Sequence, residues 1–171
     1  MRKLLTLTAL FLGLMASAQV RTYGDMETKT FVIGLSYYYF GDEGSLSLSS
    51  GVRVVVAGNR VVSGSQVLLE NAPEGNTLIG THDFTDDGEP ELMIATRGNG
   101  MVKAQVYRLT GQTWTLLGTV GARGDVDEIR VFRQAATVKD RTTGALYTWT
   151  CHGGRFDFKS SAGGPDPAPG L

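Results

Sequence analysis

Short runs of β-branched and aromatic residues, separated by glycine-rich turns, follow one another along this chain. The 23 glycines fall mainly between these runs, where turns are expected. Residues 102–106 alternate apolar and polar side chains, which is the period of a half-buried strand. Outside the N-terminus, no segment has the 3.6-residue spacing of an amphipathic helix. The sequence therefore predicts an all-β fold built from antiparallel hairpins, arranged as a partial propeller-like array or as a compact sandwich.

The expected strands are bounded by glycine, asparagine and aspartate. They cover residues 30–40, 52–56, 60–62, 67–70, 77–80, 91–96, 101–109, 113–117, 129–132, 145–150 and 155–159. Among the aromatic residues of these strands, we expect Trp114, Tyr147, Trp149 and Phe156 to be buried.

The first eighteen residues have the pattern of a cleaved secretory signal. Arg2 and Lys3 are followed by an apolar stretch over residues 4–14, and Ala16-Ser17-Ala18 provides a cleavage site. The apolar stretch is too short to span a bilayer. We therefore expect a signal peptide over residues 1–18 and a mature chain that starts at Gln19. That chain would be secreted or periplasmic and would have no integral membrane segment.

Cleavage would leave about 153 residues, which is enough for one domain with a core of its own. We assign residues 19–159 to a single all-β domain. Residues 160–171 are rich in glycine and proline and have no apolar pattern, so we expect a flexible tail there. The formal net charge is −1, and the chain contains no basic run. This composition argues against nucleic acid as a partner.

The candidate functional site is the acidic loop, which we define as residues 83–91, with the sequence DFTDDGEPE. Oxygen-bearing side chains occupy loop positions 1, 3, 5 and 9, and Gly88 occupies position 6. This spacing lets a short loop direct several oxygens at a hard cation such as calcium. The predicted ligands are the side chains of Asp83, Thr85, Asp87 and Glu91, together with the backbone carbonyl of Glu89.

An EF-hand is excluded, because position 12 is Ile94 and the residues that follow the loop favour a strand. Two other readings of the loop stay open. It can be a solvated acidic turn in which Asp83 and Asp87 hydrogen-bond to their own backbone, or it can be a loop that binds a partner.

The loop resembles the calcium-loop hairpin of FG-GAP and VCBS-type repeats, which build integrin-like propeller blades. Two hairpins with a tyrosine, a glycine turn and a second aromatic, at residues 107–114 and 147–156, add to this resemblance, which covers residues 80–158. The resemblance implies a propeller-like arrangement of hairpins and a bound calcium ion. A blade takes about 40–45 residues, so the mature chain has room for three or four.

Catalytic motifs are absent from the sequence, which has no G-x-S-x-G elbow, no H-E-x-x-H and no phosphate-binding glycine loop. The single cysteine, Cys151, is expected to be a buried apolar residue, and His152 should point to the opposite face of its strand. We therefore predict an exported, non-catalytic binding or scaffold protein with an unknown protein or glycan partner. The alternative is a small secreted hydrolase whose site is built from dispersed carboxylates.

Overall fold

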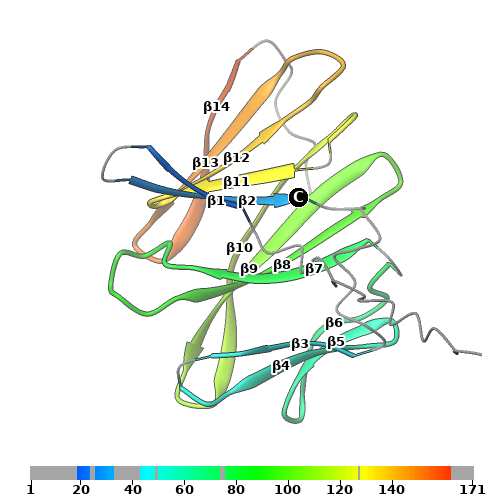
Figure 1. Ribbon diagram of the computed structural model, residues 1–171, viewed down its shortest axis with the longest axis vertical. Helices are drawn as coiled ribbons and strands as arrows, with labels where there is room; N and C mark the ends of the chain where they lie inside the picture. The colour runs from blue at the N-terminus through cyan, green and yellow to red at the C-terminus, as the bar shows by residue number, and fades with distance from the viewer. Residues whose placement is uncertain are drawn as a thin grey trace, which may run out of the picture.

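The computed structural model describes residues 19–23, 26–32, 43–48, 50–73, 76–126 and 128–162. All the regular structure in these residues is β-strand, arranged in three antiparallel sheets that lie one above another (Figure 1). The predicted all-β fold class is therefore confirmed. The signal peptide predicted over residues 1–18 lies outside the described residues. The described residues contain no helix that could span a membrane.

The first sheet combines the two ends of the domain. It has six strands in the order β1-β2-β11-β12-β13-β14, and every neighbouring pair is antiparallel. The strands are β1 (Gln19–Tyr23), β2 (Met26–Val32), β11 (Glu128–Phe132), β12 (Ala135–Lys139), β13 (Leu146–His152) and β14 (Arg155–Ala162).

The second and third sheets are four-stranded meanders of consecutive strands. The middle sheet of the stack contains β7 (Thr77–His82), β8 (Glu91–Gly98), β9 (Met101–Thr110) and β10 (Thr113–Arg123). The outer sheet contains β3 (Glu43–Ser47), β4 (Arg53–Ala57), β5 (Arg60–Ser63) and β6 (Gln66–Leu69).

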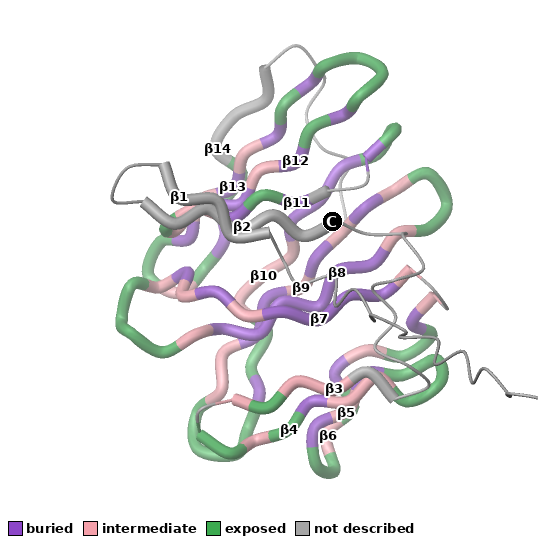
Figure 2. The backbone as a smooth tube through the Cα atoms, viewed as in Figure 1, coloured by how far each residue is buried: buried purple, intermediate pink, exposed green. Residues whose placement is uncertain are grey.

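The middle sheet is buried on both faces, and strand β8 shows how the sequence achieves this. Successive side chains on a strand point to opposite faces. Met93 and Ala95 belong to the core shared with the six-stranded sheet, whereas Leu92 and Ile94 belong to the core shared with the outer sheet. A strand covered on both sides reads as a continuous apolar run, and all six residues from Glu91 to Thr96 are buried (Figure 2). The result is a three-layer array and not a two-sheet sandwich.

A β-bulge lets strand β10 contribute to both cores. The register of β10 against β9 shifts between Leu116 and Gly118. An inserted residue reverses the face on which the following side chains lie. Trp114, before the bulge, therefore packs towards the outer sheet, while Val120 and Ala122, after it, pack towards the six-stranded sheet.

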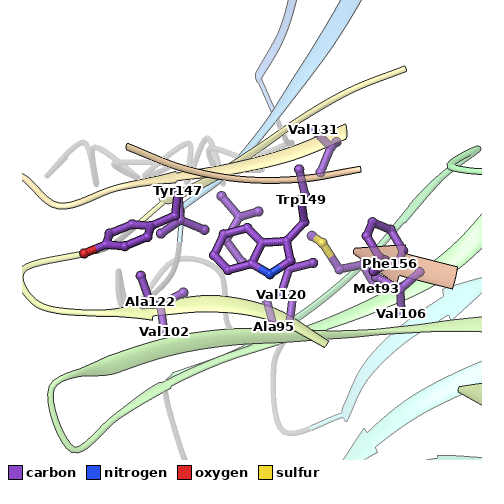
Figure 3. Close-up of a cluster of buried hydrophobic side chains, with 14 of the residues drawn as sticks. Met93, Ala95, Val102, Val106, Val120, Ala122, Val131, Tyr147, Trp149 and Phe156 are labelled. Atoms are coloured by element: carbon purple, nitrogen blue, oxygen red, sulfur yellow. The ribbon is translucent and has the colours of Figure 1, made fainter. Parts of the chain in front are cut away.

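The core beside the six-stranded sheet contains most of the predicted aromatic residues. Trp149 lies at its centre, with Tyr147 on one side and Phe156 and Met93 on the other (Figure 3). Trp114 belongs to the second core. All four aromatic residues expected to be buried are buried, with 4–9% exposure, so this prediction is confirmed.

The structure departs from the expected strands in three ways. β10 continues to Arg123, well beyond residue 117, because its pairing with β9 resumes at Gly118 after the bulge. Three strands were not predicted: β1 pairs with β2, β3 pairs with β4, and β12 pairs with strands on both sides. β14 extends through Ala162, three residues into the expected tail, and residues 163–171 lie outside the described residues. Residues 33–42, which hold most of the expected strand 30–40, also lie outside them.

Candidate functional site

The acidic loop connects β7 to β8, as the predicted strand-loop-strand arrangement requires. Its two ends are closed by the pair His82 and Glu91, which face each other in the β7–β8 register. Asp86 and Gly88 adopt positive φ angles of 59° and 88°. Glycine adopts this conformation at no steric cost, and aspartate tolerates it better than most residues. The loop therefore turns sharply at two positions within three residues.

Backbone N–H groups of the loop are bound by its own aspartates. Asp83 accepts hydrogen bonds from the backbone N–H of Gly88 through Oδ2, at 2.8 Å, and from that of Asp87 through Oδ1, at 3.3 Å. Asp87 Oδ1 accepts a hydrogen bond from the N–H of Glu89, at 3.0 Å. These are the side chain to backbone contacts that stabilise a tight polar turn.

Three of the predicted ligand side chains converge on a cation, and that cation is the guanidinium of Arg108. Arg108 Nε lies 3.1 Å from Glu91 Oε1, and Arg108 Nη2 lies 2.5 Å from Asp87 Oδ2. The same Nη2 donates to Thr85 Oγ1. Thr85 in turn donates its hydroxyl hydrogen to Glu91 Oε1, at 2.8 Å. Arg108 comes from β9, so the loop is tied to a strand that is distant in sequence.

Glu91 is the buried part of this network. Its side chain is 1% exposed, whereas that of Arg108 is 34% exposed. The second carboxylate oxygen of Glu91 accepts the backbone N–H of Phe84 at 2.8 Å. A buried carboxylate is tolerated only where it is paired and hydrogen-bonded, and Glu91 meets both conditions.

The pKa of Asp87 lies below its ordinary value of 3.8. The backbone N–H of Glu89 is the largest cause, and the positive charge of Arg108 acts in the same direction, while partial desolvation opposes both. The lowered pKa keeps Asp87 ionised and able to pair with Arg108 down to moderately acidic pH.

The loop is anchored to the six-stranded sheet by two aromatic side chains. Phe84 is fully buried and meets Phe156 edge to face, with ring centroids 5.0 Å apart. His82 is buried and lies 4.7 Å from Phe84, and its Nε2 is 2.7 Å from the carbonyl oxygen of Arg133 in the turn between β11 and β12. The loop thus joins the middle sheet to its neighbour.

The structure therefore unites part of the predicted calcium site. Thr85, Asp87 and Glu91 come together, but around a guanidinium. Asp83 directs both carboxylate oxygens at loop N–H groups, and Glu89 contributes its backbone N–H to Asp87. Within the ranges that the structure describes, no group of three or more His, Cys, Asp or Glu residues is arranged to hold a metal ion. The donor set fits a metal ion poorly while Arg108 engages three of its oxygens.

Arg108 is the member of this network that the sequence analysis did not identify. In the sequence it is one polar position in an alternating strand. The signal that could have revealed it is the turn at Asn99 and Gly100, where both residues have positive φ. A two-residue turn of this kind fixes the register of the hairpin, with Gly98 opposite Met101 and Leu92 opposite Tyr107. One step further, the same register places Arg108 beside Glu91.

Cys151 and His152 do not form a catalytic pair. Cys151 is buried in the core next to the six-stranded sheet, while His152 is exposed on the other side of β13. Burial raises the pKa of the Cys151 thiol, and the nearby Glu91 carboxylate adds to the effect. The prediction that Cys151 is a buried apolar residue is confirmed.

Comparison with known proteins returned no match to any family model, curated protein or solved structure.

Proposed function

We propose that this chain is an exported, non-catalytic all-β binding or scaffold protein in which a cation stabilises the acidic loop. The observation that carries the proposal is the network around Glu91. Its contacts join β8 and β9 to the loop, and Phe84 and His82 join the loop to the six-stranded sheet. The charged residues of the loop thus help to hold the middle sheet against the six-stranded sheet.

A structural role for the loop is supported by how its reactive groups are used. General acid–base or nucleophilic catalysis needs a group that can reach a substrate and change its protonation state. Glu91 is buried and paired, Asp83 and Asp87 bind backbone N–H groups, and Cys151 is buried with a raised pKa. Each of these groups has a structural contact that a catalytic role would have to break.

Export is proposed on the sequence of residues 1–18, and the partner would then be a protein or glycan of the periplasm or the extracellular medium. Expression of the full-length chain in a bacterial host, followed by N-terminal sequencing of the exported protein, tests this. The expected first residue is Gln19. A chain that stays in the cytoplasm with Met1 in place would contradict the proposal.

The non-catalytic role is tested with the purified protein and chromogenic esters, glycosides and phosphates. We expect no turnover above that of a heat-denatured sample. Turnover that the variants Asp87→Asn or Glu91→Gln remove would favour a secreted hydrolase. Retention of the protein on immobilised envelope glycans or envelope proteins is the positive result, and the Arg155→Gln variant, altered at an exposed arginine of another sheet, serves as a control for the loop variants.

The identity of the stabilising cation is a separate question. The sequence leads us to propose calcium, bound by Asp83, Thr85, Asp87, Glu91 and the Glu89 carbonyl. The Arg108 guanidinium is a second cation for the same loop, supplied by the chain itself.

A further inference from the structure

We infer that in this chain the guanidinium of Arg108 takes the place of the divalent cation for which the acidic loop has the spacing. The inference rests on the proposed function, because it concerns the cation that stabilises the same loop. It names that cation, and it makes calcium and Arg108 competitors for the same oxygens.

The distances establish the competition. Arg108 approaches Glu91 Oε1 to 3.1 Å and Asp87 Oδ2 to 2.5 Å, and it also donates to Thr85. Calcium binds oxygen ligands at about 2.3–2.6 Å. An ion bound to these three oxygens would lie where the guanidinium nitrogens lie. Two positive charges so close together repel each other, so one must leave for the other to bind.

The other carboxylate oxygens of the predicted ligands Asp83, Asp87 and Glu91 also accept hydrogen bonds. Asp83 accepts two backbone N–H groups, Asp87 Oδ1 accepts a third, and Glu91 Oε2 accepts a fourth, from Phe84. With Arg108 on the other oxygens of Asp87 and Glu91, every carboxylate of the predicted ligand set has its donor within the protein. The loop can therefore adopt its shape without an external ion.

The position of Arg108 is set by strand pairing and not by the loop. The Asn99–Gly100 turn fixes the β8–β9 register, and that register brings Arg108 next to Glu91 before the loop is considered. Glu91 is 1% exposed, so its charge requires a partner in the folded state. An arginine presents a planar fork of donors, which suits contact with several oxygens at once.

The test is thermal melting of four purified proteins, each in EDTA and in about 5 mM calcium chloride, a concentration above most calcium dissociation constants. The proteins are wild type, Arg108→Gln, Arg108→Lys and Arg155→Gln. The Arg108→Lys variant keeps the positive charge at this position. Arg155 is a matched control, because it is an arginine with an 81% exposed side chain on another sheet. Magnesium chloride at the same concentration controls for ionic strength.

For the wild type, R108K and R155Q, we expect calcium to cause no change: the melting temperature of each protein should be the same in EDTA and in calcium. R108Q should melt several degrees lower in EDTA and should recover part of that loss in calcium, because the vacated oxygens can then bind the ion. A merely structural role for Arg108 would lower the melting temperature of R108Q without creating a response to calcium.

Three results would overturn the inference. The first is a calcium-induced rise as large in wild type as in R108Q, which would leave the calcium proposal standing without competition. The second is a folded R108Q that does not respond to calcium, which would make Arg108 an ordinary ion-pair partner. The third is an R108Q that fails to fold in either buffer, because calcium should supply the missing charge. If R108Q does not respond to calcium and is also as stable as wild type in EDTA, the proposal of a cation-stabilised loop fails as well.

Discussion

Glu91 and Arg108 lie side by side on β8 and β9, with Arg108 Nε 3.1 Å from Glu91 Oε1. The pair combines a carboxylate that is almost fully buried with a guanidinium that reaches solvent. Glu91 also receives the N–H of Phe84 and the hydroxyl of Thr85, so one side chain connects the first residues of the acidic loop to the β8–β9 hairpin. Loss of this carboxylate should therefore loosen the loop and the hairpin together.

The first prediction concerns the stability that Glu91 provides. Glu91→Ala leaves Arg108, Thr85 and the Phe84 N–H without their shared acceptor. Breaking a buried ion pair by removing one partner costs about 3–5 kcal/mol, so we expect a loss near that range in urea unfolding. Glu91→Gln keeps an acceptor oxygen and should cost less, about 1–3 kcal/mol.

An exposed pair provides the matched control for this experiment. Arg60 Nε lies 2.8 Å from Glu70 Oε2, but the two side chains are 56% and 52% exposed. Exposed ion pairs contribute about 0–1 kcal/mol, so Glu70→Ala should barely change the free energy of unfolding. Equal losses of unfolding free energy for Glu91→Ala and Glu70→Ala would show that burial does not strengthen the contribution of the ion pair to stability.

The second prediction concerns the reactivity of Cys151. Its side chain is 2% exposed, and burial raises the pKa of the thiol. The thiolate is the form that reacts with disulfide reagents, so the native protein should react with such a reagent at pH 8 far more slowly than the protein in guanidinium chloride. Absorbance of the released thiol measures both rates. Equal rates would mean that the core beside the six-stranded sheet opens readily.

Local patterns in the sequence predict the strands and the buried aromatics well. Period-2 alternation identifies β9, and glycine turns separate the hairpins, because both features depend only on neighbouring residues. The strand-loop-strand arrangement around residues 83–91 follows for the same reason. The bulge in β10 and the strands β1, β3 and β12 were missed. The bulge is a feature of pairing with β9, and the sequence 135–139 has alanines and a lysine that favour strands weakly.

The acidic loop illustrates the limit of such patterns. The spacing of oxygens singles out Thr85, Asp87 and Glu91, and the structure brings these three side chains together around the guanidinium of Arg108. The spacing does not reveal this partner, because Arg108 is 17 residues from Glu91 and reaches it only through the register of the β8–β9 hairpin. A motif describes its own residues, whereas the electrostatic partner of a buried carboxylate is set by tertiary structure.

The third prediction concerns close packing between β9 and β10. A Cβ atom at Gly121 would overlap the carbonyl oxygen of Val102 and lie 2.8 Å from Lys103 Cα, and these backbone atoms cannot move aside independently. Gly121→Ala should therefore destabilise the protein by about 1–3 kcal/mol or more, measured by urea unfolding. Gly98 is the control, because a Cβ there would have Pro73 Cγ as its nearest neighbour, at 3.9 Å. We expect Gly98→Ala to stay within about 0.5 kcal/mol of wild type, and a similar cost at both positions would contradict the packing argument.

The fourth prediction concerns acid stability and Asp140. The pKa of this carboxyl lies below its ordinary value of 3.8, chiefly because of the backbone N–H of Thr143, with that of Thr142 acting in the same direction. Asp140 Oδ1 accepts these two hydrogen bonds at 3.2 Å and 2.8 Å. Asp87 in the acidic loop is shifted in the same direction.

The sign of the effect follows from proton linkage. Below pH 3.8 the unfolded chain binds a proton at Asp140 while the folded protein still resists it, so protons favour unfolding. The stabilisation is thus complete above the unfolded pKa and is lost as the pH falls through the folded pKa.

Asp140→Asn keeps an acceptor oxygen for both N–H groups but cannot titrate. Its melting temperature should therefore fall less steeply than that of wild type between about pH 4 and pH 2. Asp157, whose side chain is 63% exposed, gives the control variant Asp157→Asn, which should follow the wild-type curve. If Asp140→Asn and Asp157→Asn change the acid dependence equally, the two N–H groups at Asp140 do not account for the acid sensitivity.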